Sequence, residues 1–283
     1  MLNVLISYTD DRIVSPSMEV TPKSGEGAEA HGPDRLTIAV AGATGVVGRH
    51  VVADITRRGH RVQPIARAHG IDLLDRGQVV NALRGVDVVV DVANVDTTKA
   101  DAATAFFTGA TSNLLEGCRE HGVSRYVVLS IVGVDRVRFG YYTGTLRQEA
   151  LVRQSHGEHV VLRATQFHEF AGQTWSRMSW GPVAVAPQMR CAPVAAREVA
   201  ERLGELAVAG APKELLEMRG PEVRWLPELM RAWGRARGSR KLVLSTPIPG
   251  EGGRAMRTGA LLPAAPDFIG EESYDQWLQR SRP

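Results

Sequence analysis

The stretch Thr37-Ile-Ala-Val-Ala-Gly-Ala-Thr-Gly-Val-Val-Gly-Arg49 decides the fold, because an apolar run leads directly into glycines at positions 42, 45 and 48. Between a strand and a helix, Gly42 permits a tight turn, Gly45 lets the backbone approach a pyrophosphate, and Gly48 allows close helix packing. The start of the helix then offers unpaired amides and a positive dipole end to the phosphates. The stretch therefore predicts dinucleotide binding; the alternative is a glycine turn kept for packing alone.

The chain beyond residue 36 alternates short β-branched runs with helix-length segments. This rhythm is typical of βαβ units and predicts an α/β fold of Rossmann type with a doubly wound parallel sheet. We predict strands at 36–41, 61–66, 87–92, 125–130 and 159–163, and helices at 46–58, 75–84, 99–121 and 143–156. In the longest helix an apolar stripe that includes Phe106 and Phe107 indicates core packing.

Three regions are expected along the chain. Residues 1–35 are rich in Pro, Gly, Ser and Glu, which predicts a disordered leader. Residues 36–180 form the nucleotide-binding Rossmann domain. In residues 181–283 prolines break the chain into short pieces, which indicates a small mixed lobe that completes the fold and holds the substrate. Within this lobe we expect helices at 195–209 and 226–237 and a strand at 241–245.

The composition restricts the class of partner. The 34 basic and 31 acidic residues give a net charge of only +3, which does not favour nucleic acid. Cys118 and Cys191 are far apart and lack partners at metal-ligand spacing, which fits a reducing cytoplasm and no metal site. No apolar run reaches the ~20 residues that span a bilayer. We expect a soluble cytoplasmic protein without a membrane partner, of open oligomeric state.

The residues that follow the predicted strands indicate which dinucleotide binds. Arg67 follows the second strand where an acidic residue would favour NAD, so NADP is preferred over NAD unless Arg67 is an ordinary solvated arginine. Asp72 is expected near the adenine amino group, and Ala93 beside the nucleotide. Asp75 is expected to cap the following helix. The turn residues expected to contact the cofactor, besides the three glycines, are Thr44, Val46 and Val47.

Several segments together resemble a known family. They are the glycine turn, the Gly-Ile-Asp72-Leu segment, Leu129-Ser130-Ile-Val-Gly-Val-Asp135, Tyr141-Tyr142, and Leu162-Arg-Ala-Thr165-Gln-Phe-His-Glu-Phe170. The chain from residue 36 to about residue 280 resembles the atypical short-chain dehydrogenase/reductases of the NmrA-like branch. The resemblance implies a Rossmann fold with NAD(P) bound across the strand ends and a small C-terminal lobe that closes over the substrate.

The resemblance also implies a catalytic serine and tyrosine, but it is incomplete. Ser130 matches the serine that orients a carbonyl, and Tyr141 matches the tyrosine that transfers its proton. The lysine expected four residues later is replaced by Thr145. Without such a cation a tyrosine has its ordinary pKa of about 10. Tyr141 and Tyr142 are equally well explained as an aromatic pair packed at the start of a helix.

Three functions remain open from the sequence. The first is an NAD(P)-dependent oxidoreductase that acts on a hydrophobic carbonyl or quinone-like molecule. The second is a redox-silent NADP sensor, for which the missing lysine is unimportant. The third is a hydrolase without a cofactor that opens an epoxide with Asp135 as base or nucleophile, although an aspartate beside Arg136 is more typical of a solvated ion pair.

The pocket for the substrate is expected to be apolar and aromatic. The residues expected to line it are Tyr142, Gln166, Phe167, Trp175 and Trp180. His168 and Glu169 are adjacent in a segment predicted to be extended, so their side chains point in opposite directions and make a poor chelating pair.

Overall fold

The structure, a computed structural model, describes residues 35–97, 99–137 and 140–281. The predicted disordered leader lies outside these residues except for Arg35. Among the described helices, none has the length and the apolar composition required to span a membrane.

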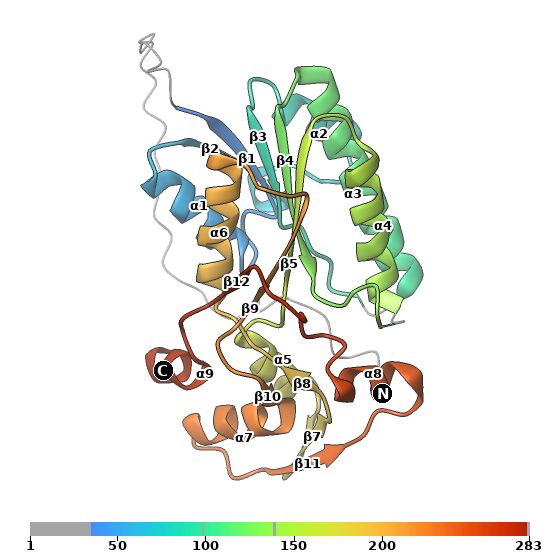
Figure 1. Cartoon of the computed structure of the whole chain (residues 1–283), viewed down its shortest axis with the longest axis vertical. Helices are drawn as coiled ribbons and strands as arrows, with labels where there is room; N and C mark the ends of the chain where they lie inside the picture. Colours follow the sequence, from blue (N-terminus) through green and yellow to red (C-terminus); the bar gives the residue numbers. More distant parts are fainter. Residues whose placement is uncertain (1–34, 98, 138–139, 282–283) are drawn as a thin grey trace.

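The main body is a parallel sheet of seven strands in the order β12-β9-β5-β4-β3-β1-β2. Figure 1 shows helices α1 and α6 on one face of the sheet and helices α2, α3 and α4 on the other. The strands are β1 (Thr37–Ala41), β2 (Arg61–Ile65), β3 (Val88–Asp91), β4 (Arg125–Ile131), β5 (Glu158–Ala164), β9 (Leu215–Arg219) and β12 (Phe268–Ile269). The helices are α1 (Gly48–Arg57), α2 (Arg76–Ala82), α3 (Ala100–His121), α4 (Gly140–Gln154) and α6 (Ala196–Ala209). The predicted Rossmann-type fold is confirmed.

The local sequence explains these elements. Val88–Asp91 is buried throughout, as a strand covered by helices on both faces requires. Asp75 caps α2 as predicted, because its carboxylate accepts a hydrogen bond from the Gln78 backbone N–H at 3.0 Å. Helix α4 begins at Gly140, three residues earlier than expected, so Tyr141 and Tyr142 lie inside its first turn.

The chain beyond residue 180 contributes to both parts of the molecule. Strands β9 and β12 and helix α6 return to the main sheet. The remaining elements of this region form the smaller lobe beneath the sheet, together with residues 169–180, which fall within the range predicted for the Rossmann domain (Figure 1). The predicted helix at 226–237 and strand at 241–245 are found in this lobe. These elements are α5 (Glu169–Arg177), β6 (Ser179–Trp180), β7 (Val183–Pro187), β8 (Arg190–Cys191), β10 (Arg224–Trp225), α7 (Leu226–Ala236), β11 (Leu242–Thr246), α8 (Gly250–Thr258) and α9 (Tyr274–Arg280).

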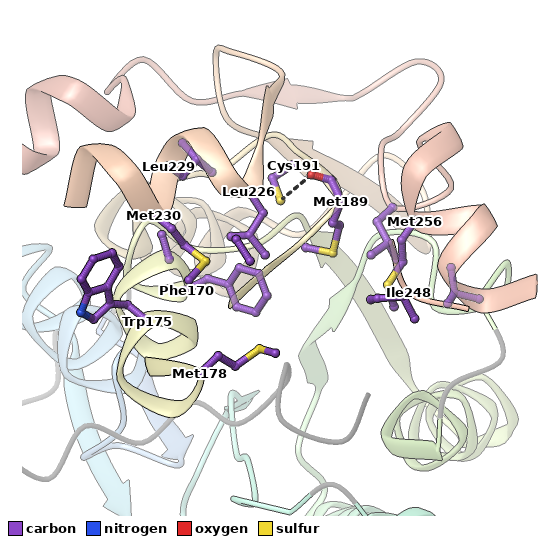
Figure 2. Close-up of a cluster of buried hydrophobic side chains, with 14 of the residues drawn as sticks. Phe170, Trp175, Met178, Met189, Cys191, Leu226, Leu229, Met230, Ile248 and Met256 are labelled. Carbon is purple, nitrogen blue, oxygen red and sulfur yellow. Dashed lines mark hydrogen bonds between the residues drawn. The ribbon is translucent and has the colours of Figure 1, made fainter. Parts of the chain in front are cut away.

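The smaller lobe has its own hydrophobic core, which is rich in methionine. Figure 2 shows Phe170, Trp175 and Met178 from α5 and the adjoining turn facing Met230 and its neighbours on α7. Cys191 is buried in the same core, and burial raises the pKa of its thiol. Methionine side chains fill irregular gaps, so this core suits a lobe built from short pieces.

A buried histidine joins the lobe to the C-terminal helix and gives stability a pH dependence. His168 is fully buried against the rings of Tyr274 and Trp277, and its Nε2 lies 3.1 Å from the carbonyl oxygen of Glu272. Burial lowers the pKa of His168 from 6.5 to about 4. Because the folded protein then binds fewer protons than the unfolded chain, stability falls as the pH is lowered from 6.5 to 4, by up to ~3 kcal/mol.

We expect His168→Phe to abolish this contribution, as measured by urea denaturation of the variant and the wild type at several pH values. Burial raises the pKa of the neighbouring Glu169, which contributes with the opposite sign, so only the difference between the two proteins isolates His168. His156→Phe on the surface is the matched control. Equal pH dependence in all three proteins would contradict the assignment.

Candidate functional site

The glycine turn follows β1, and its geometry requires two of its glycines. Gly42 has a φ of +79°, and a Cβ on it would lie 2.8 Å from the Cα of Ala93. A Cβ on Gly48 would lie 2.0 Å from the carbonyl oxygen of Gly42. The predicted tight turn and close helix packing are thus confirmed, although α1 begins at Gly48 and not at Val46.

A cavity of about 620 Å³ runs along the carboxyl ends of strands β2, β1, β3, β4 and β5. It therefore crosses the point between β1 and β3 where the order of the strands reverses, the position at which open α/β sheets bind ligands. The turn residues that line it are Gly42, Thr44, Gly45, Val46 and Val47. Gly48 faces the turn and is not among the lining residues.

The start of α1 faces this cavity without a competing charge. No acidic residue lies in its first turn, and no side chain in the described part of the protein caps its start at Val47. Helix amides without a capping side chain, together with the helix dipole, favour an anionic group.

Residues after β2 and β3 form one end of the cavity. Arg67 is exposed and lines it, as do Asp72 and Ala93. One carboxylate oxygen of Asp72 already accepts a hydrogen bond from the Leu74 backbone N–H at 3.0 Å, which shapes the loop beneath the predicted adenine position.

Ser130, at the end of β4, lines the other end of the cavity and belongs to a buried charged network. Its hydroxyl donates to Oε1 of Glu149 at 2.5 Å. Glu149 also accepts from Nε and Nη2 of Arg163, both at 2.8 Å, and from Arg153 at 3.0 Å. Burial opposes the charge of Arg163, but its bonds to Glu149 and Asp135 raise its pKa above the usual value. Glu149 and Arg163 are the main site residues absent from the sequence prediction.

Tyr141 and Thr145 lie on the face of α4 that lines the cavity. The hydroxyl of Tyr141 donates to Oδ1 of Asn94, and that oxygen also accepts from the Val95 backbone N–H at 2.8 Å. Thr145 is 3% exposed, and its Oγ1 has no hydrogen-bond partner among the described residues. Thr174, in contrast, donates to the carbonyl four residues earlier, at 2.9 Å. The Thr145 hydroxyl is thus a buried polar group at the cavity wall without a partner in the described part of the protein.

Asp135 lies outside the cavity lining and is held by arginines. Its carboxylate accepts from Arg163 at 3.0 Å and lies 3.8 Å from Arg136, so the ion pair with Arg136 that the sequence left open is present. Partial burial acts to raise the pKa of Asp135, but Arg163 lowers it below the ordinary value. The structure therefore does not bring Asp135 together with Ser130 and Tyr141 at the cavity.

The expected substrate residues are divided between the cavity and the lobe. Phe167 lines the cavity. Tyr142 and Gln166 are buried and are not among the residues that line it. Trp175 packs against Trp233 in the core of the lobe, and Trp180 is exposed on β6. The structure does not bring these two tryptophans to the cavity.

Other residues at or near the cavity are not expected there from the sequence. Phe106 and Phe107, in the predicted core stripe, also line it. Asp91, at the end of β3, accepts hydrogen bonds from Tyr126 at 2.7 Å and from Gln148 at 3.0 Å, and burial raises its pKa despite them. The signal for such groups is a polar residue at the end of an apolar strand or on the inward face of a helix.

Comparisons with known proteins agree with this geometry. Residues 42–200 match the model of a family described as NAD(P)H-binding. A curated relative, divinyl chlorophyllide a 8-vinyl-reductase from Oryza sativa subsp. indica, is 26% identical over 225 residues, which cover 67% of this chain and 55% of the relative. The chain thus spans about half the length of that relative.

Two solved structures share the fold. A short-chain dehydrogenase/reductase superfamily protein from Agrobacterium tumefaciens with bound NAD has a TM-score of 0.64 at 19% identity, covering 87% of this chain and 96% of that one. An NADPH-dependent quinone oxidoreductase from Escherichia coli has a TM-score of 0.61 at 13% identity, covering 86% and 98%. The chain belongs to the NAD(P)H-binding family, and it shares its fold with the short-chain dehydrogenase/reductase superfamily protein, in agreement with the resemblance stated from the sequence.

Proposed function

We propose that the protein is an NADP-dependent oxidoreductase that acts on a hydrophobic carbonyl or quinone-like small molecule. The observation that carries the proposal is the continuity of the cavity. One space extends from the glycine turn, across the strand ends, to Ser130 and Tyr141 beside the aromatic side chains of Phe106, Phe107 and Phe167. The glycine turn, which suits a dinucleotide, and the aromatic side chains, which suit a second, hydrophobic molecule, therefore line the same cavity.

The residues present fit a dinucleotide. The Gly42 turn leaves no room for a Cβ, and the start of α1 favours an anion. The hydroxyl of Thr145, which has no partner among the residues that the structure describes, lines the far end of the same cavity. Gly45 and the amides near Val47 would hold the pyrophosphate, and Arg67 the 2′-phosphate. When bound, the cofactor supplies or accepts a hydride. The chain's own residues position the substrate, and Tyr141 or water handles the proton.

The names of the comparison proteins support redox chemistry over hydrolysis. The sequence relative is named a vinyl-reductase and one structural neighbour a quinone oxidoreductase. The position of Asp135 favours the same choice, since a carboxylate held by Arg163 and placed outside the cavity lining is a poor base for opening an epoxide. Hydrolysis is therefore the second candidate function, after reduction.

Arg67 is expected to distinguish NADPH from NADH. Since an arginine bonds a phosphate by charge-assisted hydrogen bonds, Arg67→Ala should weaken NADPH binding about tenfold or more and leave NADH binding unchanged. Isothermal titration calorimetry with both cofactors measures this difference. Arg84→Ala, an exposed arginine outside the cavity lining, is the control. An equal loss for NADPH and NADH would show that Arg67 does not distinguish them.

The function itself is tested by titration and turnover together. Wild-type protein is titrated with NADPH, NADP, NADH and NAD and then assayed for NADPH oxidation with quinones and aromatic ketones. Micromolar binding of NADPH with turnover supports the proposal. Binding of NADPH without turnover across these substrates would favour the redox-silent sensor. No binding of any cofactor would overturn the proposal and make the hydrolase the leading candidate.

A further inference from the structure

The hydroxyl proton of Ser130 points away from the cavity. A carboxylate only accepts hydrogen bonds, so in the 2.5 Å contact with Glu149 the serine must be the donor. Both residues are buried, and Glu149 is held by Arg163 and Arg153. A hydrogen bond to a carboxylate is about twice as strong as one to a neutral carbonyl, so a substrate carbonyl would not draw the proton away. Toward the cavity Ser130 offers its lone pairs.

The hydroxyl proton of Tyr141 is also donated to a protein group. It is donated to Oδ1 of Asn94, and the Val95 backbone N–H, which donates to the same oxygen at 2.8 Å, identifies that atom as the amide oxygen. Asn94 and Glu149 come from different elements, so the two observations are independent. Both hydroxyls of the expected catalytic pair are thus donors to the protein.

We propose that this pocket presents Ser130 and Tyr141 as hydrogen-bond acceptors to the substrate that binds beside the cofactor. The pocket therefore selects an aromatic hydroxyl compound over the corresponding carbonyl compound. The inference rests on the proposed function, and it assigns the tighter-binding partner to the reduced side of the reaction, an alcohol or hydroquinone. Phe106, Phe107 and Phe167 supply the flat apolar wall. A carbonyl oxygen in the same place would face the lone pairs of the Ser130 and Tyr141 hydroxyl oxygens.

Glu149 acts in this scheme through Ser130 and is a positioning residue. Its carboxylate holds the serine proton, while Arg163 and Arg153 keep the carboxylate in place. An amide at position 149 is able to donate to Ser130 as well as accept from it. Glu149→Gln should therefore free the serine proton for the ligand and lower the preference for the hydroxyl compound.

The test uses two ligands of similar shape, of which only one is able to donate a hydrogen bond. We would measure the Kd of 1-naphthol and of 1-methoxynaphthalene for the full chain with saturating NADP, because neither ligand is open to hydride transfer. The expected result is roughly tenfold tighter binding of 1-naphthol. Ser130→Ala should lower this ratio several-fold while NADP affinity stays unchanged. Ser155→Ala, near the far end of α4, should leave the ratio unchanged.

Several outcomes would overturn the proposal. They are equal binding of the two ligands, preference for the methoxy compound, no binding of 1-naphthol by protein that binds NADP, and a ratio that does not change in Ser130→Ala. Glu149→Gln adds a second readout wherever it folds, since a structural role alone would not change the ratio of two affinities. Quinone turnover and NADPH binding, measured separately, show whether the proposed function stands when this inference fails.

Discussion

Replacing Gly45 by leucine should abolish cofactor binding and leave the fold intact. A Cβ at this position would contact only the carbonyl oxygen of Gly42, at 3.3 Å, so a side chain here is accommodated with a small shift. Gly45 lines the cavity, however, and the rest of the leucine would occupy the space where the backbone must approach a pyrophosphate. We expect the affinity for NADPH to fall about 100-fold or more, measured by calorimetry.

Gly48→Ala is the contrasting variant. Its Cβ would lie 2.0 Å from the Gly42 carbonyl oxygen, a backbone atom that cannot move aside without opening the turn, so this change should lower stability by about 1–3 kcal/mol. Gly45→Leu should keep the wild-type melting temperature within a few degrees. If Gly45→Leu bound NADPH normally, the assignment of this turn to the pyrophosphate would be wrong.

The parts of the fold with a local signal were predictable from the sequence. The strand before Gly42 is apolar except for Thr37, and the spacing of the glycines predicts a turn and a helix after it. The same reasoning placed the cap at Asp75. The return of β9 and β12 to the main sheet was not predictable, because β12 has only two residues and its partner is chosen by tertiary contacts.

Site residues were predictable from the sequence only where a residue of suitable chemistry stands at a position that a motif defines. Ser130 and Tyr141 follow from the resemblance, and both line the cavity. The tryptophans were assigned from aromatic character alone, which does not distinguish a pocket from a lobe core. Trp175 lies against Gly234 on α7, a contact no local pattern shows. Glu149 and Arg163 were missed because their partners are far apart in sequence, although an arginine within the apolar strand β5 was a signal.

Arg163→Met should strongly destabilise the protein, because it removes one partner of a buried ion pair. Arg163 is 5% exposed and bonds both oxygens of Glu149, which is 2% exposed. Methionine fills a similar space but leaves Glu149 buried with Arg153 as its remaining arginine. Loss of one partner from a buried ion pair costs about 3–5 kcal/mol, since the other charge stays desolvated. The melting temperature should therefore fall on the order of 10 °C.

Arg136→Met is the matched control for this loss. Arg136 also contacts Asp135, but at 3.8 Å and from a side chain that is 41% exposed, so its removal should cost less than about 1 kcal/mol. The double variant Glu149→Met/Arg163→Met should be more stable than Arg163→Met alone, because the buried Glu149 charge is then removed together with its partner. If urea denaturation gave equal stabilities for Arg163→Met and Arg136→Met, the buried network would not stabilise the fold. The Glu149 carboxylate would then not be held rigidly enough to keep the Ser130 hydroxyl as a hydrogen-bond donor to it.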